Sequence, residues 1–407
     1  MKAKSIEYER FKSVQEFKLS KIISAIALLT IVLSTVFTLS SCKPGHGSLY
    51  TEYKWSSQLG VNQEGFLYVE DHVLWFYDFA SGQRVVLCNK PDCQHKPYSS
   101  YTNPDPECNA VLQNRDSFDG FAMHNDYVYI FCRSSINKTT LYRQKPDGDG
   151  REILTEFDWE IDPFNDIIFR DNMAYLVGVQ YILDELGFGS SGNQISIVLS
   201  VDLQTGKVRE LTEVKDDNQQ RVEQIQVVGE NLYYNYFYYD EGADFDFMAE
   251  DAYEQSLKYF NYFAYQVDIS TGTEKQVLDL AEHLYGYISL DDEYIYYLSE
   301  DSLKVYSVDR EDSSERVLFE SKDKLYCIKL DDYLFMSQVD DISTVHCYNL
   351  PTSKTVEINR PEEETLPAFI YDKIWFFGVV NEDGSVSTVF MKEEDYINGK
   401  TDYITIN

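Results

Sequence analysis

Basic side chains are scarce in this sequence: 35 lysines and arginines stand against 69 aspartates and glutamates, for a formal net charge of −34. A nucleic-acid-binding protein needs a basic surface to neutralise phosphates, so this balance excludes nucleic acid as a partner. Only 6 histidines occur, and the chain has no G-x-S-x-G, H-E-x-x-H or Walker sequence. The usual signatures of serine hydrolases, zinc proteases and P-loop enzymes are therefore missing.

Glycine and proline are also few, with 20 and 10 copies, whereas tyrosine occurs 33 times and phenylalanine 24 times. Aromatic residues fit pleated, half-buried surfaces, so this composition favours β structure. With 43% hydrophobic and 26% charged residues the composition is that of a folded globular protein. A chain of 407 residues is long enough for two or three domains or for one large domain built from repeats.

The first 41 residues have the pattern of an export signal. A segment with six basic residues precedes a charge-free apolar stretch from Ile22 to Leu39. Leu39-Ser40-Ser41-Cys42 then follows the pattern of a lipobox, which predicts cleavage before Cys42 and acylation of that residue. Residues 42–49 read as the lipidated cysteine and a flexible tether. The alternative is an uncleaved membrane anchor, because the apolar stretch is close to the minimum length that spans a bilayer.

One pattern recurs through the rest of the chain, residues 50–407: a strand, a polar turn, an aromatic strand, a third strand that ends in aspartate or asparagine, a tight turn and a fourth strand. The aromatic second-strand motif occurs seven times, at 65–68, 126–129, 172–175, 231–234, 294–297, 332–335 and 373–376. Repeats of roughly 40–60 residues with four short strands are typical of propeller blades. The sequence therefore predicts an all-β protein, a single β-propeller of seven blades, with six or eight blades as the alternatives.

Three segments lengthen the loops of the predicted blades: 88–114, 183–194 and 240–262. In a four-stranded meander the loops after the second and fourth strands emerge on the same face. The three insertions should therefore share one face of the ring, which is called the insertion face below. Long loops on one face of a rigid scaffold are where binding sites usually lie.

Three cysteines and a histidine lie close together in the first insertion: Cys88, Cys93, His95 and Cys108. Their ligand types suit a structural zinc site. A disulfide clamp is the main alternative, because an exported domain folds in an oxidising compartment. Catalysis by Cys93 and His95 is the third interpretation, although no partner that would orient the base is recognisable.

The lipobox, the Asp-x-x-Thr-Gly turns at 202–206 and 268–272, and the element Cys-x-Lys-Pro-Asp-Cys-x-His at 88–95 resemble uncharacterised bacterial surface lipoproteins. These have a β-propeller domain similar to that of low-density-lipoprotein-receptor-related proteins. The resemblance implies a propeller and a lipid anchor, and no specific activity.

The expected function is that of a membrane-anchored extracytoplasmic lipoprotein, held through Cys42 at the bacterial cell membrane, whose propeller binds a protein, peptide or glycan. The alternative is an extracytoplasmic glycan hydrolase or lyase that uses carboxylates at the propeller axis. Within this sequence no motif identifies the ligand-binding residues.

Overall fold

The computed structural model describes residues 50–51, 59–61 and 64–406, apart from the gaps 104–105, 113–117, 163–164, 166, 184–188, 214–217, 241–257, 281–286, 292, 300, 340, 362, 372 and 383. The predicted signal and Cys42 lie outside these residues. Within the described part, no helix is long and apolar enough to cross a membrane.

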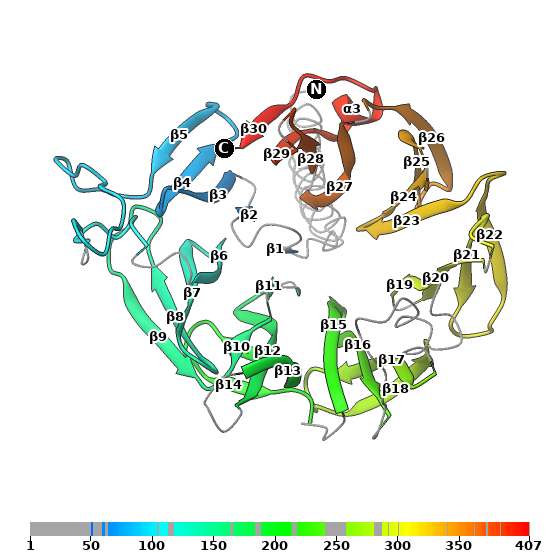
Figure 1. Ribbon diagram of the computed structural model, residues 1–407, viewed down its shortest axis with the longest axis horizontal. Coiled ribbons are helices and arrows are strands. Elements are labelled where there is room, and N and C mark those ends of the chain that lie inside the picture. Colours follow the sequence, from blue (N-terminus) through cyan, green and yellow to red (C-terminus); the bar gives the residue numbers. More distant parts are fainter. Residues whose placement is uncertain are drawn as a thin grey trace, which may run out of the picture. The chain divides into compact units, whose positions relative to one another are not determined.

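The fold is a seven-bladed β-propeller, as the repeats predict. Seven antiparallel sheets follow one another around a ring in chain order (Figure 1). Blades 1 to 3 contain β2 (Leu59–Val61), β3 (Gly65–Glu70), β4 (Val73–Asp78), β5 (Gln83–Val86); β6 (Phe118–His124), β7 (Tyr127–Ser135), β8 (Lys138–Gln144), β9 (Glu152–Phe157); β11 (Ile167–Arg170), β12 (Met173–Leu183), β13 (Gly189–Asp202) and β14 (Val208–Glu210). Two short strands, β1 (Tyr50–Thr51) and β10 (Glu160–Ile161), add to blade 3 by pairing with β11 and β12.

Blades 4 to 7 contain β15 (Asn218–Val228), β16 (Asn231–Tyr239), β17 (Phe260–Asp268), β18 (Glu274–Asp279); β19 (Tyr287–Leu290), β20 (Tyr294–Leu298), β21 (Lys304–Asp309), β22 (Glu315–Glu320); β23 (Leu325–Leu330), β24 (Tyr333–Gln338), β25 (Asp341–Asn349), β26 (Lys354–Asn359); β27 (Glu364–Tyr371), β28 (Ile374–Val380), β29 (Val386–Lys392) and β30 (Ile404–Ile406). One short helix, α3 (Glu393–Ile397), precedes the last strand. First strands of neighbouring blades contact one another, as β19 and β23 do, so these strands form the inner side of the ring.

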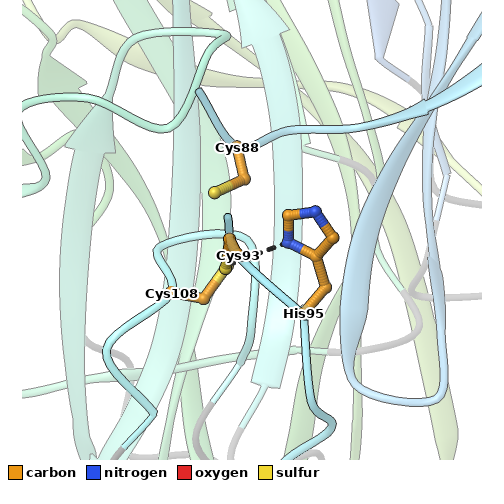
Figure 2. A group of neighbouring side chains, drawn as sticks. All are labelled: Cys88, Cys93, His95 and Cys108. Carbon is orange, nitrogen blue, oxygen red and sulfur yellow. Dashed lines mark hydrogen bonds between the residues drawn. The ribbon is translucent and has the colours of Figure 1, made fainter. Parts of the chain in front are cut away.

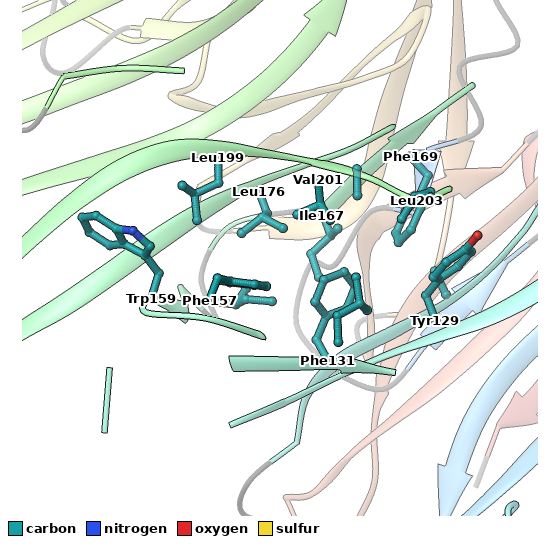
Figure 3. Packing of buried hydrophobic residues seen from close by; sticks show 14 of the residues in the cluster. Tyr129, Phe131, Phe157, Trp159, Ile167, Phe169, Leu176, Leu199, Val201 and Leu203 are labelled. Atoms are coloured by element: carbon teal, nitrogen blue, oxygen red, sulfur yellow. The ribbon is translucent and has the colours of Figure 1, made fainter. Parts of the chain in front are cut away.

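The repeated aromatic motif forms the core between blades. Each of its seven copies lies in, or leads into, the second strand of a blade, as predicted. Tyr129 and Phe131 of blade 2, for example, pack against Phe169 of blade 3 with ring centroids 5.9 and 6.4 Å apart (Figure 3). Many of the tyrosines and phenylalanines therefore pack between adjacent blades and bury the faces of the sheets.

The turns between third and fourth strands also form as their sequences predict. In the turn that follows Asp202, the Asp202 carboxylate accepts the backbone N–H groups of Gln204 and Thr205 at 2.8 and 3.0 Å. Gly206 takes a φ of +73°, a left-handed conformation that glycine adopts without steric cost. The Asp268 turn repeats this arrangement, with Gly272 at φ +74°.

Two of the three predicted insertions contain more strand than expected. Strands β12 and β13 stay paired as far as Leu183 and Gly189, so most of 183–194 belongs to a long hairpin. Strand β17 begins at Phe260, so the end of 240–262 is strand too, and Tyr262 is buried. The sequence of 247–257 is that of a short helix by prediction, and these residues lie outside the described part.

The first and last blades meet without exchanging a strand. Each of these two sheets is built from strands that are consecutive in the chain, β2 to β5 and β27 to β30. Phe66 of β3 instead packs against Phe376 and Phe390 of blade 7, with ring centroids 5.9 and 5.1 Å apart. Among the described residues, therefore, no shared strand closes the ring, and this aromatic packing joins the two blades.

Candidate metal centre

The loop that carries the cysteines and the histidine leaves and re-enters blade 1 at a single residue of β4. The backbone N–H of Leu87 donates to the carbonyl of Leu74 at 3.2 Å, and the N–H of Leu74 donates to the carbonyl of Ala110 at 2.7 Å. A further bond joins the N–H of Leu112 to the carbonyl of His72 at 2.8 Å. Residues 88–109 therefore form one long loop, which we call the cysteine loop. Hydrogen bonds to β4 hold its two ends together, and we call these joined ends its base.

Local turns bring the four side chains back to this base. Cys88 is the first residue of the loop, and Cys108 lies just before its return. Pro91 occupies a turn in which the N–H of Cys93 donates to the carbonyl of Lys90 at 3.2 Å, a position that suits the fixed φ of proline. The Lys90 ammonium donates to the carbonyl of Glu107 at 2.5 Å and so connects the two ends of the loop.

The side chains of Cys88, Cys93, His95 and Cys108 meet in one place (Figure 2). Their ligand atoms all lie within 4.8 Å of one another, and the Nδ1 atom of His95 is 3.5 Å from the Sγ atom of Cys108. Three sulfurs and one imidazole nitrogen at such separations are close enough to bind a metal ion. The structure thus brings together all four residues that the sequence suggested.

The thiols of this cluster differ in their electrostatic surroundings. Burial raises the pKa of Cys108 to about 12. Burial also acts against ionisation of Cys93, but hydrogen bonds from the backbone of His95 and from the side chains of Cys108 and Cys88 outweigh it and hold the pKa of Cys93 below its ordinary value. Cys93 is thus the readier of these two thiols to become a thiolate, the form that binds metal.

The cysteine loop is docked on the neighbouring blade as well. The Asn89 side chain donates to the Asp147 carboxylate at 3.1 Å, and the Asn109 side chain donates to the carbonyl of Gly148 at 2.6 Å. Gly148 has a φ of +82°, and a Cβ atom there would lie 2.4 Å from the carbonyl oxygen of Leu87. Only glycine therefore lets the β8–β9 turn approach the loop so closely.

The returning end of the loop fills the seam between blades 1 and 2. Ala110, Val111 and Leu112 are buried among Leu74 of blade 1 and Phe121 of blade 2. The cluster thus lies directly above a packed interface, and a metal ion there would restrain the chain on both sides of it.

The outer part of the cysteine loop projects one aromatic side chain into solvent. Ser99 and Asn103 exchange backbone hydrogen bonds at 3.2 and 2.9 Å, and the Ser99 hydroxyl accepts the N–H of Thr102 at 3.2 Å. Tyr101, at the tip of this turn, is 94% exposed, more than any other large hydrophobic side chain among the described residues. An ordered backbone with an exposed aromatic tip suits recognition of a partner.

The structure also bears on the alternative roles of the cysteines, in a disulfide or in catalysis. Every cysteine in the described part is a free thiol. Cys327 on β23 and Cys347 on β25 are buried, and β24 lies between them. His95 contacts Cys108, and among the described residues no carboxylate orients its ring, which gives a nucleophilic Cys93 no support from geometry.

A carboxylate does lie on the inner strand of blade 4. Glu223 on β15 has its carboxylate 3.8 Å from the Nε atom of Arg221, which in turn contacts the buried Asp162 at 3.3 Å. Burial raises the pKa of Glu223 more than the Arg221 guanidinium lowers it, and the charge on Asp162 adds to the increase. No motif in the sequence distinguished this residue, because the neighbouring Arg221 makes its contact with Asp162 between blades 4 and 3.

Comparisons with known proteins find structures of similar fold but identify no family for this chain. No family model matches the chain, and no curated protein matches it in sequence. A puromycin-hydrolyzing peptidase of Mycobacterium tuberculosis matches in structure with a TM-score of 0.50 at 10% identity, over 88% of this chain and 54% of the peptidase. This chain therefore spans about half the length of that enzyme.

Two further solved structures match less well. An oligogalacturonate lyase in complex with manganese has a TM-score of 0.47 at 10% identity, over 84% of this chain and 89% of the lyase. Dipeptidyl peptidase 4 of Porphyromonas gingivalis has a TM-score of 0.46 at 10% identity, over 87% of this chain and 60% of the peptidase. At such low identity a structural match shows the fold alone.

Proposed function

We propose that this protein is a surface binding module: a propeller anchored to the outer side of the bacterial cell membrane through acylated Cys42, of the kind found in uncharacterised bacterial surface lipoproteins, that binds a protein, peptide or glycan. The proposed anchor depends on the sequence around Cys42. The observation that carries the binding role is the cysteine loop, which is closed at its base, docked on blade 2, and exposes Tyr101 at its tip.

The metal in this proposal is zinc. Zinc prefers four ligands from thiolates and imidazoles, and a site in which protein side chains fill every position is structural. Cys88, Cys93, His95 and Cys108 supply such a set with no position left for substrate. The ion would stiffen the base of the loop, so that less conformational entropy is lost when the tip meets a partner.

Replacing Tyr101 by serine is expected to weaken partner binding without changing stability. An exposed aromatic anchor contributes affinity through the area it buries on binding, and its loss typically costs about 2 kcal/mol or more, roughly a thirtyfold change in Kd. The measurement is recovery of envelope proteins and glycans from the native host on the immobilised protein, followed by titration of whatever binds. Tyr326→Ser is the matched control, because Tyr326 is also exposed but lies on β23. Equal binding by both variants would count against the loop.

The second candidate, a glycan hydrolase or lyase, is favoured by one observation: Glu223, a carboxylate with a raised pKa on the inner strand of the ring. Such a group is suited to general acid catalysis. Screening the protein against polysaccharides, with Glu223→Gln as the control, tests this function directly. Activity that survives the substitution would rule out Glu223 as its acid.

The raised pKa also has a consequence for stability that needs no substrate. In the unfolded chain Glu223 loses its proton at a lower pH than in the folded protein, so its ionisation costs folding free energy as pH rises above the ordinary glutamate pKa. Glu223→Gln should therefore raise the melting temperature slightly at pH 8, since solvent screens a side chain that is 35% exposed, and change it little at pH 4. Thermal unfolding at both pH values checks this, with Glu210→Gln on the exposed strand β14 as control. A melting temperature that the substitution leaves unchanged or lowers at pH 8 contradicts the raised pKa.

A further inference from the structure

Arg151 places a cation beside the proposed metal centre, and no carboxylate of the described residues pairs with it. It lies just before β9 and is partly buried; its Nε atom donates to the Gln144 side chain at 2.7 Å, and its Nη2 atom donates to the carbonyl of Asn109. Asn109 directly follows Cys108 in the chain. Among the described residues, no aspartate or glutamate forms an ion pair with Arg151.

Most other partly buried arginines of the described residues pair with a carboxylate, although Arg310 donates instead to the Tyr233 hydroxyl and the carbonyl of Asp291. Arg143 contacts Glu152, Arg221 contacts Asp162, and the buried Arg360 contacts Glu364. Removing a cation from water without a compensating charge is costly, so a site that buries one usually supplies an anion. Burial indeed lowers the pKa of Arg151, and the groups that oppose this effect are Cys132, Tyr142 and Cys108, none of which is a carboxylate.

A metal ion bound by Cys88, Cys93, His95 and Cys108 would supply the missing negative charge. A divalent ion held by three thiolates and one neutral imidazole carries a net charge of −1, whereas a disulfide carries none. We infer that Arg151 is the counter-charge of a divalent metal centre at Cys88, Cys93, His95 and Cys108 and that it strengthens metal binding there. This inference rests on the proposed metal centre and makes Arg151 a positioning residue, because it acts through the carbonyl beside Cys108 and through its charge.

Outer-shell partners of metal ligands typically change metal affinity by about 10–100-fold when replaced. The full chain is loaded with Zn²⁺ or Co²⁺, and its affinity is measured by competition with a chelator of known strength. Arg151→Gln should bind 10–100-fold more weakly than the unchanged protein, since glutamine keeps a hydrogen-bond donor and loses the charge. Arg151→Lys should recover part of the loss. Arg143→Gln, which removes a guanidinium from the same blade, should bind as the unchanged protein does.

The visible absorption of the Co²⁺-loaded protein separates charge from architecture. An Arg151→Gln variant that keeps the tetrahedral thiolate spectrum at reduced affinity supports the inference. Equal affinity of Arg151→Gln and Arg143→Gln, an Arg151→Lys variant as weak as Arg151→Gln, or a changed spectrum overturns it. If the wild-type protein binds no divalent metal, the proposal of a metal centre is wrong as well. Partner binding through Tyr101 is measured separately and can survive any of these results.

Discussion

Removing the metal should lower the unfolding free energy by about 4 kcal/mol, because a ligand at a thousandfold excess over its Kd stabilises the native state by that amount. The metal can be removed in two ways, by the substitution Cys108→Ser or by treating the wild-type protein with a strong chelator. The effect should begin in the cysteine loop, whose base then depends on the bonds of Leu74 and the contact between Lys90 and Glu107. Thermal unfolding measures the stability, and limited proteolysis at 96–103 reports the loop.

The matched control for Cys108→Ser is Cys347→Ser, which also replaces a buried thiol but in the core of blade 6. Both variants should be destabilised. The Cys347→Ser protein should remain sensitive to the chelator, and the Cys108→Ser protein should be insensitive to it. If the chelator leaves the unchanged protein unaffected and its mass is lower by two hydrogens, a disulfide has formed in place of the metal site, and the zinc proposal is wrong.

The blade pattern could be predicted from the sequence because its causes are local. The motif that ends in Tyr129 and the turn that follows Asp202 owe their structure to alternation, to a carboxylate that accepts nearby amides, and to a glycine at positive φ. Such signals span a few residues, and the aromatic motif recurs in all seven blades. Seven copies therefore indicated both the fold and the number of blades.

The metal cluster could be proposed from the sequence but not decided. Cys88, Cys93, His95 and Cys108 are ligand types at close spacing, yet the same spacing fits a disulfide. What brings all four side chains together is the closure of the loop on Leu74, which depends on β4, a strand that precedes the loop in the chain. Sequence spacing within the loop carries no information on that pairing.

The residues that support the site could not be predicted. Gly148, Asn109 and Arg151 act through contacts between the cysteine loop and blade 2, about 40 residues apart in sequence. Residues 147–150 lie in the turn between β8 and β9, and the docking of this turn against Leu87 depends on how adjacent blades pack. Glu223 and Arg221 likewise became a site candidate only once blade 3 placed Asp162 beside them.

Replacing Phe66 by alanine should cost about 3–5 kcal/mol and open the ring between its first and last blades. Phe66 is 1% exposed and its ring contacts those of Tyr77, Phe376 and Phe390, so the substitution leaves a large cavity at the closure. A propeller whose first and last blades share a strand has backbone hydrogen bonds between those two blades. Here β30 pairs with β29 of its own blade instead. Amide hydrogen exchange should therefore accelerate first in β2 to β5 and β27 to β30.

Phe131→Ala is the control, because Phe131 is also fully buried between two blades, blades 2 and 3, where the chain runs directly from one to the other. Its loss should destabilise the protein by a similar amount without selective exchange in the first and last blades. The difference arises from connectivity: blades that follow one another in the chain stay close when their packing weakens, whereas the first and last blades are far apart in the chain and share no described strand. Uniform exchange in both variants would show that the seam is held by contacts other than this aromatic cluster.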